Sequence, residues 1–300
     1  MTGRIVEISE SGRFLSVHRG FLVVSEKKEE LGRVPLADIE ALLITGHGNS
    51  LSTPVLEKMV EAGGMVVICG QNFHPTAMVW PMEGHHLHAE RLRLQIEASV
   101  PLKKRLWQYL IRAKIANQSA VLDYFGKDGA NVRNLIPRVA SGDPQNCEAQ
   151  ASRRYWSPLM GQEFRRDPKG EGLNILLNYG YAVLRASCAR AVSASGLHPA
   201  LGIHHKNPAN AFALVDDLME PFRPVVDHFV KKLDEEGVHE LNPASKKRLA
   251  SVLTLDLNGP QGASPVSNCL QYLAQSLVKS FEAKKPMLVL PPPPLPLEWE

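Results

Sequence analysis

The chain has 300 residues, 44% of them hydrophobic, and a formal net charge of +3. This is ordinary globular composition, with enough apolar side chains for a core in one or two domains. The four cysteines (Cys69, Cys147, Cys188 and Cys269) lie far apart and form no CxxC pair, which argues against a zinc finger and a disulfide framework. No apolar run approaches the ~18 residues of a membrane span and the first residues hold no apolar signal segment, so we expect a cytoplasmic protein without a membrane partner.

The first eighty residues are predicted to be rich in strands. Residues 4–8, 14–17 and 21–24 are short runs of β-branched and aromatic side chains, separated by Ser-Gly and Arg-Gly turn signals. Residues 52–63 resemble a capped helix, with proline in the first turn and glycine past the end. Few residues suited to catalysis occur here, so we interpret this region as a scaffold or a dimer surface.

Helical patterns dominate the chain from Ala89 onward, where apolar residues recur at helical spacing. The sequence therefore predicts an α+β fold, with a small N-terminal β-rich domain followed by a larger all-α catalytic domain. The expected boundaries are 1–80 for the β-rich domain, 81–90 for a linker, 91–285 for the helical domain and 286–300 for an extended, Pro-rich tail.

Positive charge is concentrated in the middle of the chain. Residues 91–166 contain 14 Lys and Arg against 6 Asp and Glu, whereas residues 1–80 contain 7 against 9. A basic segment in a nearly neutral chain is typical of a polyanion-binding face, although such residues can also simply solvate helices. No sequence-reading motif accompanies the basic residues, so any nucleic acid would be recognised by its backbone and shape.

Residues 201–224 contain the strongest candidate metal ligands. A neutral imidazole and carboxylates are suitable ligands for a hard or borderline divalent cation, whereas the absence of thiolate disfavours zinc. The candidates in this stretch are His204, His205, Asp216, Asp217 and Glu220. On a helix Asp217 and Glu220 share one face. The competing interpretation is a hydrogen-bonded loop histidine followed by a solvated acidic helix face.

The expected geometry of this stretch depends on where its helix begins and ends. Asn210 is a suitable N-cap residue, and Pro221 lacks the N–H that would bond the Asp217 carbonyl, so the helix should bend or end there. His205 would then reach Glu220 only if residues 205–209 run back alongside the helix.

A second histidine cluster, His85, His86 and His88, lies near the predicted linker. One hypothesis is a second metal site, which would make the protein an unrelated metallohydrolase. Adjacent histidines splay apart and few carboxylates are close in sequence, so a polar hinge is the favoured interpretation.

Three segments together resemble a known family. They are Glu148 to Trp156 with its Tyr-Trp pair, LLNYGYAVLRA at 176–186, and GLHPALGIHH through FALVDDLMEPFRP at 196–224. They resemble the CRISPR-associated adaptation endonuclease/integrases, the first-numbered Cas protein family, and most closely its type II branch. The resemblance extends over essentially the whole chain, including the order of a β-rich and then a helical domain.

This resemblance implies a set of site residues. The family's metal and catalytic ligands correspond to Glu148, His205 and Glu220, and Glu220 stands where many members have Asp. Asp217 matches a further acidic position next to the site. His204 is not part of the usual pattern, which leaves open which histidine of the pair faces the metal; we assign His205 from its spacing to Glu220.

The resemblance also implies a function. Such proteins are metal-dependent DNA endonuclease/integrases that insert spacer DNA into a repeat array, where a 3′-hydroxyl attacks a phosphodiester in a transesterification. The implied cofactor is Mg²⁺ or Mn²⁺, and the implied partners are double-stranded DNA, a second copy in a homodimer and the small second-numbered Cas protein in a heterohexamer. The residues we assign to DNA binding are Arg91, Arg93, Lys103, Lys104, Arg112, Arg153 and Arg154. The alternative is a non-enzymatic DNA-binding scaffold of the adaptation complex.

Overall fold

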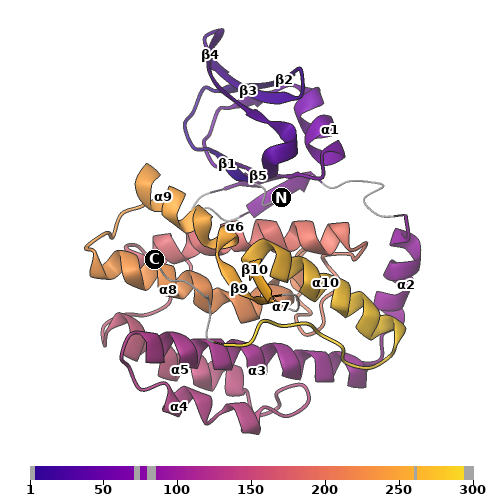
Figure 1. Cartoon of the computed structure of the whole chain (residues 1–300), viewed down its shortest axis with the longest axis vertical. Helices are drawn as coiled ribbons and strands as arrows, with labels where there is room; N and C mark the ends of the chain where they lie inside the picture. The colour runs from indigo at the N-terminus through magenta and orange to yellow at the C-terminus, as the bar shows by residue number, and fades with distance from the viewer. Residues whose placement is uncertain (1–3, 71–74, 80–85, 260–261, 294–300) are drawn as a thin grey trace. The chain divides into compact units, whose positions relative to one another are not determined.

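The computed structural model describes residues 4–70, 75–79, 86–259 and 262–293. The chain divides into two compact units, Met1–Gly84 and His85–Glu300 (Figure 1). The first unit is rich in strands and the second is mainly helical. This order confirms the α+β fold class predicted from the sequence.

The N-terminal unit contains two sheets. One has the strand order β1 (Arg4–Ile8), β5 (Ile39–Ile44), β7 (Met65–Cys69) and β8 (Pro75–Val79), with only its last pair antiparallel. The other has the order β4 (Glu29–Pro35), β3 (Phe21–Glu26), β2 (Phe14–His18) and β6 (Ser50–Leu51). Helix α1 (Thr53–Glu61) forms where the pattern over 52–63 predicted a helix, although Ser52 makes no side-chain cap, and it contacts β2 and β7.

The core of this unit is formed by a fully buried strand and one face of a helix. All six residues of β5 are buried, as is typical of a strand with parallel neighbours on both sides. Val55 and Met59 of α1 are four residues apart, share one helix face and are fully buried. The buried cluster comprises Ile8, Leu15, Leu22, Leu36, Ile39, Leu42, Ile44, Val55, Met59 and Val66, with Leu36 in the short 3₁₀ helix η1 (Leu36–Asp38).

The helical unit is organised around α6 (Leu173–Ala194), which is buried along most of its length. It contacts α7 (Ala213–Met219), α8 (Arg223–Glu235), α9 (Pro243–Ala250) and α10 (Val266–Glu282). Gly180 explains one close approach, because a Cβ atom at this position would collide with the Val226 side chain of α8. Gly180 thus lets α6 and α8 pack closely.

Helix α3 (Val100–Tyr124) is the other long element of this unit. It begins after Ser99, whose hydroxyl caps it, and contacts α4 (Ala130–Arg133) and the 3₁₀ helix η3 (Ile136–Arg138). It runs beside α5 (Cys147–Met160) and also contacts α8 (Figure 1). Helix α2 (His88–Glu97) begins within residues 81–90, which the sequence analysis assigned to a linker.

A β-hairpin is the main element that the sequence analysis missed. Strands β9 (Asp256–Gly259) and β10 (Gly262–Pro265) pair in antiparallel fashion after the 3₁₀ helix η5 (Ser251–Thr254) and lead into α10. Helix α10 therefore begins only at Val266. The segment 256–265 is rich in small and turn-forming residues rather than β-branched ones, so it carries little strand signal.

The described part of the Pro-rich tail is tied to α10 by two serine hydroxyls. Ser280 Oγ accepts a hydrogen bond from the Met287 N–H, and Ser276 Oγ accepts one from the Val289 N–H, both at 2.9 Å. All four cysteines are free and buried. Of the helices in the described ranges, none is long and apolar enough to cross a membrane.

Candidate active site

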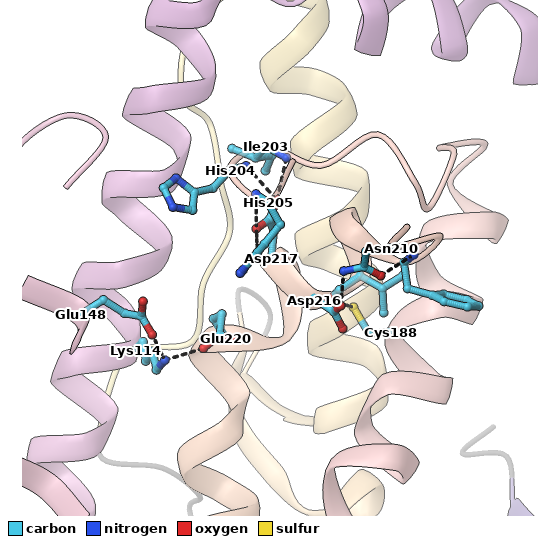
Figure 2. Close-up of polar contacts among 12 residues, drawn as sticks. Lys114, Glu148, Cys188, Ile203, His204, His205, Asn210, Asp216, Asp217 and Glu220 are labelled. Atoms are coloured by element: carbon cyan, nitrogen blue, oxygen red, sulfur yellow. Dashed lines mark hydrogen bonds and ion pairs between the residues drawn. The ribbon is translucent and has the colours of Figure 1, made fainter. Parts of the chain in front are cut away.

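Asp217 of α7 organises the loop that carries the paired histidines (Figure 2). Its fully buried carboxylate accepts backbone N–H bonds from Ile203 at 2.6 Å, His204 at 2.9 Å and His205 at 3.3 Å. Its Oδ1 atom also lies 2.5 Å from His205 Nδ1. Residues 203–205 therefore turn back over the helix because one buried carboxylate satisfies several of their donors.

The two adjacent histidines have different surroundings. His205 is about half exposed, and its hydrogen bond to Asp217 raises the pKa of the imidazole. Because Nδ1 faces Asp217, Nε2 is the ring nitrogen left to bind a ligand. His204 instead stacks on Trp107, with ring centroids 4.1 Å apart, and burial lowers its pKa. This contrast supports His205 over His204 as the ligand.

Glu148 lies in the first turn of α5. Asn146 adopts a left-handed conformation (φ 51°) and its side chain accepts the Ala149 N–H. The Asp143 carboxylate accepts the N–H groups of Cys147 at 2.9 Å and Glu148 at 3.0 Å. These two caps fix the start of the helix and hence the position of Glu148.

Glu148 and Glu220 meet on one cation, the ammonium of Lys114 (Figure 2). Lys114 Nζ lies 2.6 Å from Glu148 Oε1 and 2.5 Å from Glu220 Oε2. Glu220 also accepts from Arg223 Nε at 2.7 Å. Burial disfavours the Glu220 carboxylate, but the charges of Arg223 and Lys114 outweigh burial and lower its pKa to about 2. Glu220 is therefore ionised at neutral pH.

The helix that carries Asp217 ends where Pro221 predicted. Helix α7 stops at Met219 and is followed by the 3₁₀ helix η4 (Glu220–Phe222), which confirms the expected break. The carbonyl of Pro221 accepts a hydrogen bond from Asn117 Nδ2 of α3 at 2.8 Å. This contact joins η4 to the helix that carries Lys114.

The start of the same helix differs from the expectation. It begins at Ala213 rather than near Asn210, and its N-cap residue, Phe212, makes no side-chain cap. The Asn210 side chain accepts the Phe212 N–H at 2.9 Å and donates to Asp216 Oδ2 at 2.8 Å. Asn210 thus forms an Asx turn that precedes the helix instead of capping it.

The three predicted ligands are not brought together as one group: Glu148 and Glu220 meet at Lys114, whereas His205 is paired with Asp217. In the ranges that the structure describes, no set of three or more His, Cys, Asp or Glu side chains is arranged to hold a metal ion. The donor chemistry nevertheless fits Mg²⁺ or Mn²⁺, because the two carboxylates already converge on a positive charge and His205 has a free Nε2. The assignment of Glu148, His205 and Glu220 as ligands stays a prediction.

A cavity of about 180 Å³ adjoins Glu220. It is lined by Lys114, Gln118, Ser152, Trp156, Arg166, Tyr181, Glu220, Arg223 and Asp227. Three cations and two aromatic rings among these residues make it suitable for a phosphate-bearing ligand. Lys114, Arg166 and Arg223 were not predicted as site residues from the sequence; Arg223 had a detectable signal, since it follows Glu220 by three residues.

Asp227 is a buried carboxylate at the edge of this cavity. Tyr155 Oη donates to its Oδ2 at 3.0 Å, and Tyr181 Oη donates to its Oδ1. Burial raises the pKa of Asp227 to about 6, and the hydrogen bonds from Tyr181 and Tyr155 limit that increase. The ordinary pKa of an aspartate is 3.8, so between about pH 4 and 6 the folded protein keeps Asp227 protonated while the unfolded chain has lost that proton. The free energy of unfolding therefore falls as pH rises through this window.

Replacing Tyr155 by Phe is expected to destabilise the protein more at pH 8 than at pH 5. The change removes a hydrogen bond to the Asp227 carboxylate and so raises the pKa of Asp227 further. The expected loss is about 2 kcal/mol at pH 8, where the acid is ionised, and less at pH 5. Urea unfolding at both pH values measures it, with the exposed Tyr109→Phe as the control. Equal losses at both pH values would contradict this account.

A family model matches most of the chain. The family model for the CRISPR-associated protein Cas1 matches residues 6–254. The chain belongs to the Cas1 family. A CRISPR-associated endonuclease Cas1 from Neisseria meningitidis serogroup C (strain 8013) is 39% identical over 257 residues, which cover 84% of each chain. This relative is consistent with the type II-like branch expected from the sequence.

Solved structures share the Cas1 fold. A casposase bound to integration product has a TM-score of 0.79 at 20% identity, covering 96% of this chain and 92% of the casposase. A chain of a Cas6-RT-Cas1–Cas2 complex has a TM-score of 0.77 at 16% identity, covering 97% of this chain and 36% of the other. At these identities the likeness concerns the fold.

The basic residues assigned to DNA binding through the Cas1 resemblance differ in their exposure to solvent. Arg91 donates to the Ser195 carbonyl and Arg112 to the Val139 carbonyl, so both contribute to packing. Burial and the nearby Lys206 charge lower the pKa of Lys103. The exposed members are Arg93, Lys104, Arg153 and Arg154, with Arg154 also bonded to the Asn131 carbonyl.

The histidine cluster near the start of the helical unit is only partly described. His85 lies outside the described residues, and His88 Nδ1 lies 3.2 Å from the Gly196 carbonyl. His86 and His88 belong to no metal-binding group among the residues described. The polar-hinge interpretation stays a prediction.

Proposed function

We propose that this Cas1-family chain is a metal-dependent DNA endonuclease/integrase of CRISPR adaptation, which joins a DNA 3′-hydroxyl to a phosphodiester of a repeat array. One observation carries the proposal: Glu148 and Glu220, from separate helical elements, converge on a single positive charge. His205, fixed by Asp217, comes from the loop before the second of these elements. Family membership supports the same function.

Each residue has a role that follows from its surroundings. Glu148, Glu220 and His205 would hold Mg²⁺ or Mn²⁺, which supplies Lewis-acid stabilisation of a phosphoryl oxygen when bound. Asp217 holds His205 Nδ1 and so directs Nε2 away from itself. The guanidinium groups of Arg166 and Arg223 line the adjoining cavity and would attract a phosphodiester.

The proposed substrate and partners come from named relatives. One structural neighbour is described as bound to integration product and another as a complex with Cas2. We extend these descriptions to double-stranded DNA and to the second-numbered Cas protein as partners of this chain. The homodimer, the heterohexamer and the cytoplasmic location stay predictions from the sequence.

The proposal is tested by strand transfer of a short duplex with a free 3′-hydroxyl into supercoiled plasmid. Reactions contain Mn²⁺, Mg²⁺ or EDTA, each with and without the small partner protein. Joined products that require the metal ion are the expected result. No joining under any of these conditions would reject the integrase function.

A non-enzymatic DNA-binding scaffold is the second candidate, because the ion pairs with Lys114 can also be purely structural. Both candidates require the exposed basic side chains to contact DNA phosphates. Under the scaffold function, alanine at Glu148 or Glu220 would leave the affinity for metal ions unchanged.

Replacing both Lys104 and Arg153 by Ala is expected to weaken DNA binding for every sequence tested. Each lost phosphate contact should reduce the slope of log affinity against log salt by about 0.9. Fluorescence anisotropy with an unspecific duplex across a salt series measures this slope. Lys247→Ala, which removes an exposed charge of α9, is the matched control. An unchanged slope in the double variant would exclude these two residues from the DNA contact.

A further inference from the structure

Lys114 is an unusual neighbour for two predicted metal ligands. Its side chain is 8% exposed, and its ammonium lies 2.6 Å from Glu148 and 2.5 Å from Glu220. A divalent ion held by both carboxylates would need the same space, and two cations in contact repel each other strongly in a buried setting. The ammonium must therefore leave its position when a metal ion enters.

The structure offers a second position for this ammonium. Gln118 lies one turn further along α3, on the same helix face as Lys114, and is 2% exposed. Its Oε1 atom is buried without a hydrogen-bond partner among the described residues. A buried acceptor without a donor is costly, so its presence calls for an explanation. Gln118 and Lys114 also line the same cavity of about 180 Å³, which provides space for the movement.

We propose that Lys114 is an internal cation with two positions, bridging Glu148 and Glu220 in the metal-free protein and moving to Gln118 Oε1 when a divalent ion binds. This inference rests on the metal centre proposed above. In the first position the ammonium keeps two nearby carboxylates together that would otherwise repel each other. In the second it satisfies the unpaired amide oxygen and keeps its charge inside the cavity.

The two positions make Lys114 a competitor of the metal ion. Metal affinity is reduced by the fraction of molecules in which the ammonium bridges the carboxylates. If that fraction is about nine in ten, its removal should tighten the apparent dissociation constant about tenfold. Removal of the Gln118 acceptor acts in the opposite direction, because the displaced ammonium then has no partner.

The experiment measures Mn²⁺ binding by electron paramagnetic resonance for the wild type, Lys114→Met and Gln118→Leu. We expect binding about tenfold tighter in Lys114→Met and several-fold weaker in Gln118→Leu. Lys279→Met, on a different helix, should bind like the wild type. Thermal melting provides a second readout: metal-free Lys114→Met should melt below the wild type, and Mn²⁺ should raise its melting temperature by more.

The outcomes separate this inference from the metal centre itself. Binding by the wild type with equal or weaker binding by Lys114→Met would overturn the two-position role and leave the metal centre standing. If Lys114→Met does not fold, wild-type affinity in Gln118→Leu would overturn it as well. Absence of Mn²⁺ binding in all three proteins would reject the metal centre, and the inference with it.

Discussion

Replacing His205 by Ala is expected to lower the rate of metal-dependent strand transfer about a thousandfold while leaving the protein folded. The imidazole is the only nitrogen donor in the proposed ligand set, and loss of a ligand removes several kcal/mol of transition-state stabilisation. Folding should survive, because the side chain is 43% exposed and the backbone N–H of His205 still bonds Asp217.

Initial rates of plasmid joining in Mn²⁺ measure this effect, and far-UV circular dichroism with a thermal melt checks the fold. His239→Ala is the matched control, because His239 is 57% exposed and pairs with Asp234 outside the candidate site. Full activity in His205→Ala would remove His205 from the ligand set. His204, whose ring stacks on Trp107, would then be the next candidate ligand.

Replacing Asp217 by Ala is expected to reduce both stability and metal affinity. The change leaves three backbone N–H groups of residues 203–205 without their acceptor and removes the partner of His205 Nδ1. A buried donor without an acceptor costs about 1–3 kcal/mol, so a total loss on the order of 3 kcal/mol or more is expected. Loss of the group that orients a histidine ligand typically weakens metal binding by 10–100-fold.

Urea unfolding gives the change in stability, and Mn²⁺ titration of the folded variant gives the change in affinity. Glu240→Gln alters an exposed acid near α9 and should change neither quantity. A stable Asp217→Ala with normal Mn²⁺ affinity would show that the loop 203–205 holds its conformation without this carboxylate. The role assigned to Asp217 would then be wrong.

Much of the fold could be predicted because the local sequence patterns match the secondary structure and the burial that these residues have in the folded protein. The strands predicted at 4–8 and 14–17 and the helix at 52–63 carry the expected composition and turn signals. Pro221 ended its helix because a proline cannot donate the next backbone bond. The hairpin β9–β10 was not predicted because its small and polar residues have low β-propensity. Its strands are stabilised by their pairing with each other, which a local sequence pattern does not indicate.

From residue spacing alone, the candidate site was predictable only where its residues are close in sequence, and Glu148 was assigned to it only through the family resemblance. Asp217 and Glu220 lie three residues apart, so their common location follows from helical geometry. Lys114 is 34 residues from Glu148 and more than a hundred from Glu220, and no local rule links these positions. Gln118 was equally invisible, because its missing partner is a property of the folded interior.

The bond from Asn117 to the Pro221 carbonyl has a mechanical consequence. It links α3 to η4 close to the site, because Asn117 is three residues from Lys114 and Pro221 directly follows Glu220. Closely packed helices that move against each other do so by small shear displacements, and a buried backbone contact of this kind resists such sliding. Changes of occupancy at the site should therefore occur by rotation of side chains within a stationary frame, on the timescale of rotamers rather than of moving domains.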